Sequence, residues 1–206
     1  MPDKNDSLYA ELETLLDEYD GFISSQDPEL VTEQTIRAWL DRFLRTFGWD
    51  PGDTREILQE SVVDSSSRER LAEIGSHHIR PDYTLVNGPN VKTYLDAKSL
   101  DIDCFSDSHA AFQVKSYGWS AGVPYAFVSN FDQLAIYDCG PVPSEEDAAN
   151  TGAVLKINRF QYLDQLETIR QYLEKAKVYS GSLDILHESL DKSGSYALDE
   201  QFNDYL

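Results

Sequence analysis

RPDYTLVNGPNVKTYLDAKS, residues 80–99, joins two strand-like runs through a turn signal. Asn-Gly between two such runs is typical of a β-hairpin. Successive side chains of a strand point to opposite faces, so Asp96 and Lys98 share one face of the second run. Asp82 opens the first run, and the hairpin can therefore bring it beside Asp96.

Two neighbouring carboxylates repel each other unless positive charge lies between them. Lys98 supplies part of that charge, and a divalent cation can supply the rest. Two aspartates are hard oxygen ligands that suit Mg²⁺, with Mn²⁺ as a substitute. The cation can polarise a phosphate and activate a water, and Lys98 can orient that water. The simpler alternative is a solvated Asp–Lys pair on a strand edge.

A helix is expected over residues 27–48, because its ends carry residues that favour helix termini. Asp27 can cap the helix, Pro28 suits its first position, and Gly48 suits its exit. Glu33 falls on the apolar side of this helix, where a carboxylate costs desolvation unless it has a partner. We therefore add Glu33 to the candidate site; the alternative is a side chain at the stripe's edge that reaches solvent.

Further patterns predict helices and strands on both sides of the hairpin. The expected elements are a helix over 8–20 with a break at 21–26, a weak strand over 55–63, a loop or short helix over 64–78, a helix over 105–122, two strands over 123–139, a strand over 153–160 and a helix over 161–177. Strands that alternate with helices in this way indicate an α/β fold with a mixed central β-sheet flanked by helices.

Gln113 and Tyr117 form a second polar motif, on the helix that follows the hairpin. They are four residues apart and therefore share a face of that helix. The spacing alone also fits an ordinary polar helix face. Its occurrence directly after the two aspartates and the lysine is what makes it part of the candidate site.

Taken in order, these motifs resemble those of the PD-(D/E)xK nuclease superfamily. More narrowly, the chain resembles the N-terminal nuclease domains of type IIG restriction-modification enzymes and of type I restriction subunits. The matching segments are EQTIRAWLDRFLRTFGWD, RPDYTL, YLDAKS, QVKSYGW and AGVPYAFVSNFDQLAIYD, within roughly residues 30–140. Asp96 stands where glutamate is commoner, and the superfamily pattern allows either.

The resemblance implies a restriction-endonuclease-like fold and a role for each motif residue. Asp82 and Asp96 would bind Mg²⁺, and Lys98 would position the attacking water. Glu33 would assist the metal or its water. The helix pair described above, Gln113 and Tyr117, would hold the site or the DNA backbone.

The resemblance also suggests how the chain is divided. We expect an endonuclease domain over residues 1–178, with its core at about 28–175, and a helical connector over 179–206. The connector would lead to a downstream domain. The implied partners are double-stranded DNA and, in the same polypeptide or complex, a methyltransferase and a target-recognition domain. The implied activity is hydrolysis of DNA phosphodiesters in defence against foreign DNA.

Net charge is the feature that fits a nuclease least, since it is −20, with 17 basic against 37 acidic side chains. DNA-binding proteins usually present a basic face. The acidity suits adaptation to high salt, or DNA affinity supplied by another domain. It also keeps two alternatives open: a catalytically silent interaction module with a nuclease fold, and an acidic DNA mimic. A mimic, however, needs no lysine beside the aspartates.

The remaining composition indicates a cytoplasmic protein with no membrane span. No apolar run approaches the roughly 18 residues that a span requires. Cys104 and Cys139 are the two cysteines, and neither has the spacing of a zinc site. His77, His78 and His109 have no recognisable partners, and we expect them to be exposed to solvent.

Overall fold

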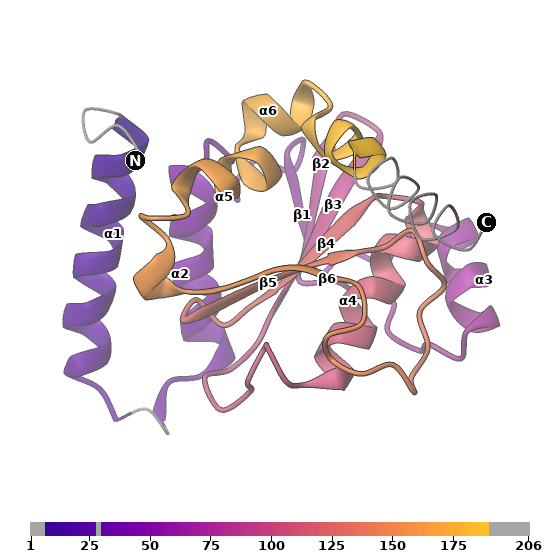
Figure 1. The fold of residues 1–206 in the computed structure, drawn as a ribbon, viewed down its shortest axis with the longest axis horizontal. Coiled ribbons are helices and arrows are strands. Elements are labelled where there is room, and N and C mark those ends of the chain that lie inside the picture. The colour runs from indigo at the N-terminus through magenta and orange to yellow at the C-terminus, as the bar shows by residue number, and fades with distance from the viewer. Residues whose placement is uncertain (1–6, 28–29, 190–206) are drawn as a thin grey trace, which may run out of the picture.

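The computed structural model describes residues 7–27 and 30–189, in which six strands form one mixed sheet covered by helices on both faces (Figure 1). The strands lie in the sheet in chain order: β1 (Ile57–Gln59), β2 (Tyr83–Asn87), β3 (Asn90–Ala97), β4 (Tyr125–Ser129), β5 (Gln133–Asp138) and β6 (Ala153–Asn158). Only β3 and β4 pair in parallel; the other neighbours are antiparallel. The expected α/β class is therefore confirmed, and the sheet is compatible with a restriction-endonuclease-like fold.

A crossover helix explains the one parallel pair, because parallel neighbours cannot be joined by a tight turn. That helix is α4 (Ser108–Ala121), which runs between β3 and β4. Asp107 caps its start by accepting a hydrogen bond from the backbone N–H of Ala110 at 2.8 Å. Gly122 ends it in the left-handed conformation, with φ at +70°. The helix expected over 105–122 is thus confirmed, and it spans Ser108–Ala121.

Helices cover the two faces of the sheet unequally. The larger apolar core lies between one face and four helices: α1 (Ser7–Ser24), α2 (Glu33–Thr46), α5 (Leu166–Leu173) and α6 (Lys175–Tyr179). A smaller core lies between the other face and two helices, α3 (Ser65–Glu73) and α4. Leu95 and Ala97 of β3 belong to the larger core, and Tyr94 belongs to the smaller one. Asp96 therefore lies on the α4 side of the sheet.

The hairpin contains one irregularity, a β-bulge in β3. On the side of the turn, Val86 pairs with Val91; beyond the shift, Leu85 pairs with Thr93. Lys92 is therefore the extra residue of the bulge. Val91 and Tyr94 consequently contact the same core, although a spacing of three positions would put them on opposite faces of a regular strand.

Two expected helix boundaries near the N-terminus are wrong. The first helix does not end at residue 20 but continues to Ser24. Tyr19 and Phe22 pack against the aromatic core, and this packing outweighs the cost of a helical glycine. The second helix starts at Glu33, and its cap is Thr32, whose hydroxyl accepts from the Thr35 N–H at 3.3 Å. Asp27 instead begins a separate turn, in which its carbonyl accepts from the Leu30 N–H at 2.9 Å.

The single helix expected over 161–177 is interrupted. A short 3₁₀ turn, η2 (Arg159–Gln161), precedes α5, and Glu174 leaves the helical conformation before α6. Residues 182–189 are again helical, and Leu183 joins the larger core. The rest of the expected connector, 190–206, lies outside the described residues. Among the described helices, none is both long enough and apolar enough to cross a membrane.

Candidate active site

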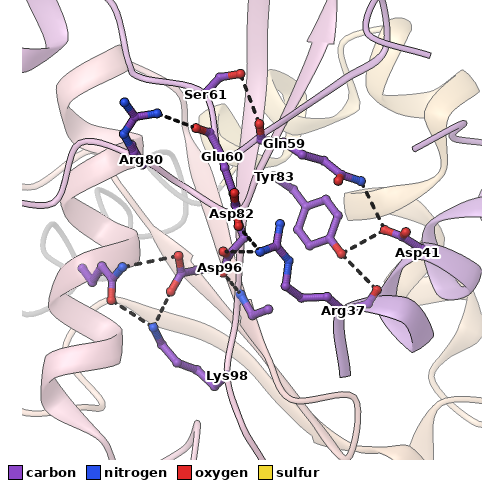
Figure 2. A network of polar contacts seen from close by, with 12 residues as sticks. Arg37, Asp41, Gln59, Glu60, Ser61, Arg80, Asp82, Tyr83, Asp96 and Lys98 are labelled. Atoms are coloured by element: carbon purple, nitrogen blue, oxygen red, sulfur yellow. Dashed lines mark hydrogen bonds and ion pairs between the residues drawn. The ribbon is translucent and has the colours of Figure 1, made fainter. Parts of the chain in front are cut away.

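The hairpin register places the two motif aspartates together at the end of the sheet where β2 begins and β3 ends. Tyr83 pairs with Leu95, so one step further along the same register sets Asp82 opposite Asp96. Asp82 Oδ2 accepts a hydrogen bond from the Ala97 backbone N–H at 2.7 Å. Figure 2 shows both carboxylates side by side at this end of the sheet. The predicted juxtaposition is therefore present.

Asp96 is the buried centre of a small polar network whose other two members, Lys98 and Gln113, are partly exposed. Its side chain is only 2% exposed. Lys98 Nζ lies 2.5 Å from Asp96 Oδ2 and donates to Gln113 Oε1 at 2.9 Å. Gln113 Nε2 donates in turn to Asp96 Oδ1 at 3.4 Å. A strand residue pair and a helix residue thus form a triangle that fixes all three side chains.

Tyr117 supports this triangle from behind. It is buried in the smaller core, and its hydroxyl accepts a hydrogen bond of 3.4 Å from Gln113 Nε2. Burial raises the pKa of Tyr117 above its usual range, so the phenol stays protonated. Of the two roles expected for the helix pair, holding the site is the one that this burial favours.

Burial and neighbouring charges shift the pKa values of Asp96 and Lys98. Burial raises the pKa of Asp96 to about 6; Lys98 opposes the rise, and the neighbouring Asp82 adds to it. Burial also works against the charge on Lys98, but the attraction of Asp96 and Asp82 raises its pKa overall. The burial of Asp96 is therefore the main cause of its raised pKa, and Lys98 only partly offsets it.

Glu33 lies elsewhere than the helical pattern predicted. As the first residue of α2 it is exposed, so its expected place in the apolar stripe is wrong. The charges of the site still affect its pKa. Partial burial, and then the charge of Asp82, raise the pKa of Glu33, while Lys98 and Arg37 oppose the rise. In the part of the chain that the structure describes, no three His, Cys, Asp or Glu side chains are grouped to hold a metal ion.

Arg37 is the site residue that the sequence motifs missed. Its Nη1 lies 3.6 Å from Asp82 Oδ1 and forms an ion pair with Glu60 (Figure 2). Arg37 follows Glu33 by four residues, which places both on the same side of α2. That spacing is a signal that could have linked the arginine to the site.

Two histidines border the site, contrary to the expectation that all would be isolated on the surface. The rings of His78 and His109 lie 5.2 Å apart. His77 and His109 are exposed as expected, but His78 is half-buried. Burial, then the charges of His109 and Lys98, lower the pKa of His78. Its imidazole is therefore favoured in the neutral form.

The two cysteines are buried and unbonded. Burial raises the pKa of Cys104 to about 12, which leaves a negligible fraction of thiolate near neutral pH. Cys104 is thus unsuited to act as a nucleophile, although it lies close to the site in the chain.

The residues present fit a hard divalent cation. Asp82, directly before β2, and Asp96 of β3 offer carboxylate oxygens that lie close together. Two protein carboxylates, with water and phosphate in the other positions, are a usual ligand set for Mg²⁺.

Comparison with known proteins supports the restriction-modification relationship. Over 182 aligned residues, the chain is 28% identical to the protein named "Type II restriction enzyme and methyltransferase RM.Eco57I" from Escherichia coli, with 84% of this chain covered. The chain spans only 18% of that protein's length. No family model and no solved structure matches the chain. The similarity covers most of the chain and so supports a relation to a restriction-modification protein.

Proposed function

We propose that this chain is the DNA endonuclease domain of a restriction-modification enzyme and hydrolyses phosphodiester bonds with Mg²⁺. The observation that carries the proposal is the pairing of Asp82 with Asp96 on adjacent strands, with Lys98 in contact with Asp96. The similarity to a protein named as both restriction enzyme and methyltransferase supports it independently. The fold agrees with the PD-(D/E)xK assignment made from the motifs.

Asp82 and Asp96 would hold the cation, since they are the two carboxylates that the hairpin register brings to the site. When bound, a divalent cation supplies Lewis-acid stabilisation of the charge that develops on the phosphate during hydrolysis. The backbone of Ala97 keeps one oxygen of Asp82 engaged and so fixes the plane of that carboxylate.

Lys98 would steady the developing negative charge and orient the attacking water. Contacts to Asp96 and Gln113 fix its ammonium group, so no reorganisation is required when the reaction begins. Gln113 and Tyr117 act through Lys98 and Asp96 by holding them in place. Glu33, at the exposed start of α2, would act from the solvent side on the cation or its water.

Double-stranded DNA is the proposed substrate, and its specific recognition is proposed to come from elsewhere. A net charge of −20 opposes the approach of a phosphate backbone, whatever the local charge at the site. The relative's printed name agrees with a methyltransferase in the same polypeptide or complex. We propose that a target-recognition domain accompanies it. A cytoplasmic role in defence against foreign DNA follows from this assignment.

Cleavage of plasmid DNA by the natural polypeptide that contains this chain tests the proposal. We expect nicking or linearisation that needs Mg²⁺ or Mn²⁺, stops on chelation and is lost in Asp82→Asn and Lys98→Ala. Metal-dependent cleavage that both variants retain would place the activity in another domain. Absence of cleavage together with absence of Mn²⁺ binding by this chain would favour the silent module or the acidic mimic.

A further inference from the structure

Arg37 reaches from α2 to the start of β2, where the proposed metal ligand Asp82 lies. The Arg37 side chain is only 12% exposed, and its Nη1 lies 3.6 Å from Asp82 Oδ1. This separation is an ion-pair distance and exceeds a hydrogen bond. The other oxygen of Asp82 is occupied by the Ala97 N–H. The two oxygens of Asp82 therefore face two different fixed partners.

The position of Arg37 is itself fixed by strand β2. The Tyr83 hydroxyl lies 3.0 Å from the Arg37 carbonyl oxygen and 2.9 Å from Asp41 Oδ1. The Arg37 guanidinium carbon lies 5.7 Å from the centre of the Tyr83 ring. Tyr83 directly follows Asp82, so the residue next to the proposed ligand anchors the arginine that faces it (Figure 2).

Glu60 completes the arrangement. It adopts a left-handed backbone conformation, with φ at +48°, which a non-glycine residue keeps only where its surroundings impose it. Its N–H donates to the Asp82 carbonyl oxygen at 3.1 Å, and its carboxylate pairs with Arg37. Arg80 donates to the Glu60 carbonyl oxygen at 3.1 Å. Glu60 is thus attached to Asp82 through its backbone and to Arg37 through its side chain.

We infer that Arg37 is a positioning residue that orients Asp82 for a divalent cation, and that Glu60 holds Arg37 in this position. The inference rests on the proposed function, in which Asp82 binds that cation. Since the Glu60 carboxylate offsets the charge of Arg37, orientation outweighs repulsion of the cation. Loss of an outer partner of a metal ligand typically weakens metal affinity by about 10- to 100-fold. If Arg37 only repelled the cation, removing Arg37 would instead strengthen metal binding.

Calorimetric titration with Mn²⁺ shows whether loss of Arg37 weakens or strengthens metal binding, without any measurement of cleavage. We expect Arg37→Met to bind Mn²⁺ about 10- to 100-fold more weakly than the wild type. Arg37→Lys, which keeps the charge and loses the planar fork, and Glu60→Gln, which frees the arginine, should show smaller losses. Arg42→Met is the matched control: Arg42 lies on the same helix and pairs with Glu18 instead. Its Mn²⁺ affinity should equal that of the wild type.

Unchanged or tighter binding by Arg37→Met would overturn the inference. If that variant fails to fold by circular dichroism, Arg37→Lys and Glu60→Gln decide, and wild-type affinity in both overturns it equally. Asp82→Asn in the same series separates the two proposals. If Asp82→Asn loses binding and the Arg37 variants do not, only the role of Arg37 fails; if Asp82→Asn binds as the wild type does, the metal site itself fails.

Discussion

Asp82 is tied to the backbone of the neighbouring strand, because its Oδ2 accepts a hydrogen bond from the Ala97 N–H at 2.7 Å. Ala97 lies between Asp96 and Lys98 in β3. One hydrogen bond from the main chain of β3 to the Asp82 side chain therefore positions the first aspartate relative to both other motif residues.

Two substitutions of Asp82 distinguish the role of its hydrogen bond to Ala97 from the role of its charge. Asp82→Asn keeps an oxygen that can accept from the Ala97 N–H, so we expect a melting temperature close to that of the wild type. Mn²⁺ affinity, measured by calorimetry, should fall at least about tenfold, because one of two anionic ligands is lost. Asp82→Ala should additionally lose about 1 kcal/mol of stability with the hydrogen bond. Equal Mn²⁺ affinity in wild type and Asp82→Asn would exclude the site.

Lys98→Ala should reduce cleavage by the natural polypeptide by roughly 10²- to 10³-fold, the usual cost of removing a preorganised electrostatic group. It should also destabilise the fold, because Asp96 would remain buried without its cation. Cleavage rates and thermal unfolding measure the two effects.

A double variant tests the cause of the lost stability. Lys98→Ala combined with Asp96→Asn removes both members of the buried ion pair, so thermal unfolding should recover toward that of the wild type. Cleavage should stay lost, because the double variant lacks both a proposed metal ligand and the proposed lysine. Stability that remained at the level of Lys98→Ala would show that the loss has another cause.

Metal affinity should depend on pH through Asp96. Its pKa is raised to about 6, so the ionised form that can bind a cation predominates above pH 6 and is lost below it. Mn²⁺ affinity should therefore fall as the pH is lowered from 7.5 to 5, and Asp96→Asn should remove most of that dependence. An affinity that is constant over this range in the wild type would contradict the assignment of Asp96 as a ligand.

Gly118 on α4 should be intolerant of any side chain. A Cβ at this position would lie 2.3 Å from Cys139 Sγ and 2.7 Å from Cys139 Cβ. Gly118→Ala should therefore cost about 1–3 kcal/mol of stability through overpacking. Gly21, within α1, has no atom within 4 Å of such a Cβ. Gly21→Ala should stabilise the protein by up to about 1 kcal/mol, and thermal unfolding of both variants tests the contrast.

The chain by itself should bind short DNA weakly and without sequence preference. The net charge of −20 opposes a phosphate backbone, and the Gln113 face of α4 is engaged by Asp96, Lys98 and Tyr117. Fluorescence anisotropy over a range of salt measures this. Tight and sequence-specific binding by the chain alone would show that recognition resides in these residues.

The parts of the site that the sequence predicted are those set by local rules. Alternation in a strand put Asp96 and Lys98 on one face, the Asn-Gly turn brought Asp82 alongside, and helical spacing paired Gln113 with Tyr117. These relationships need only short-range geometry, and the structure reproduces each of them.

The parts that were missed depend on packing between distant segments. Arg37 meets Glu60 only because α2 lies against the end of β1, and no motif spans the two. The start of α2 was misplaced because Asp27-Pro28 and Thr32 are both good helix-start signals. Only the tertiary structure, in which Thr32 caps the helix, decides between them.

The bulge at Lys92 determines which side chain of β3 meets Asp82. If the pairing on the turn side continued without the shift, Leu95 would oppose Asp82, and Asp96 would point into the larger apolar core. Deleting Lys92 would merely make the hairpin regular and leave the two aspartates opposite each other. Deleting any other single residue between Val91 and Asp96 can be absorbed in the same way, because the bulge is lost and Asp96 keeps its place opposite Asp82. Removing two residues from this segment would exchange the faces of the strand at Asp96. The number of residues between the turn and Asp96 therefore decides whether this aspartate faces Asp82.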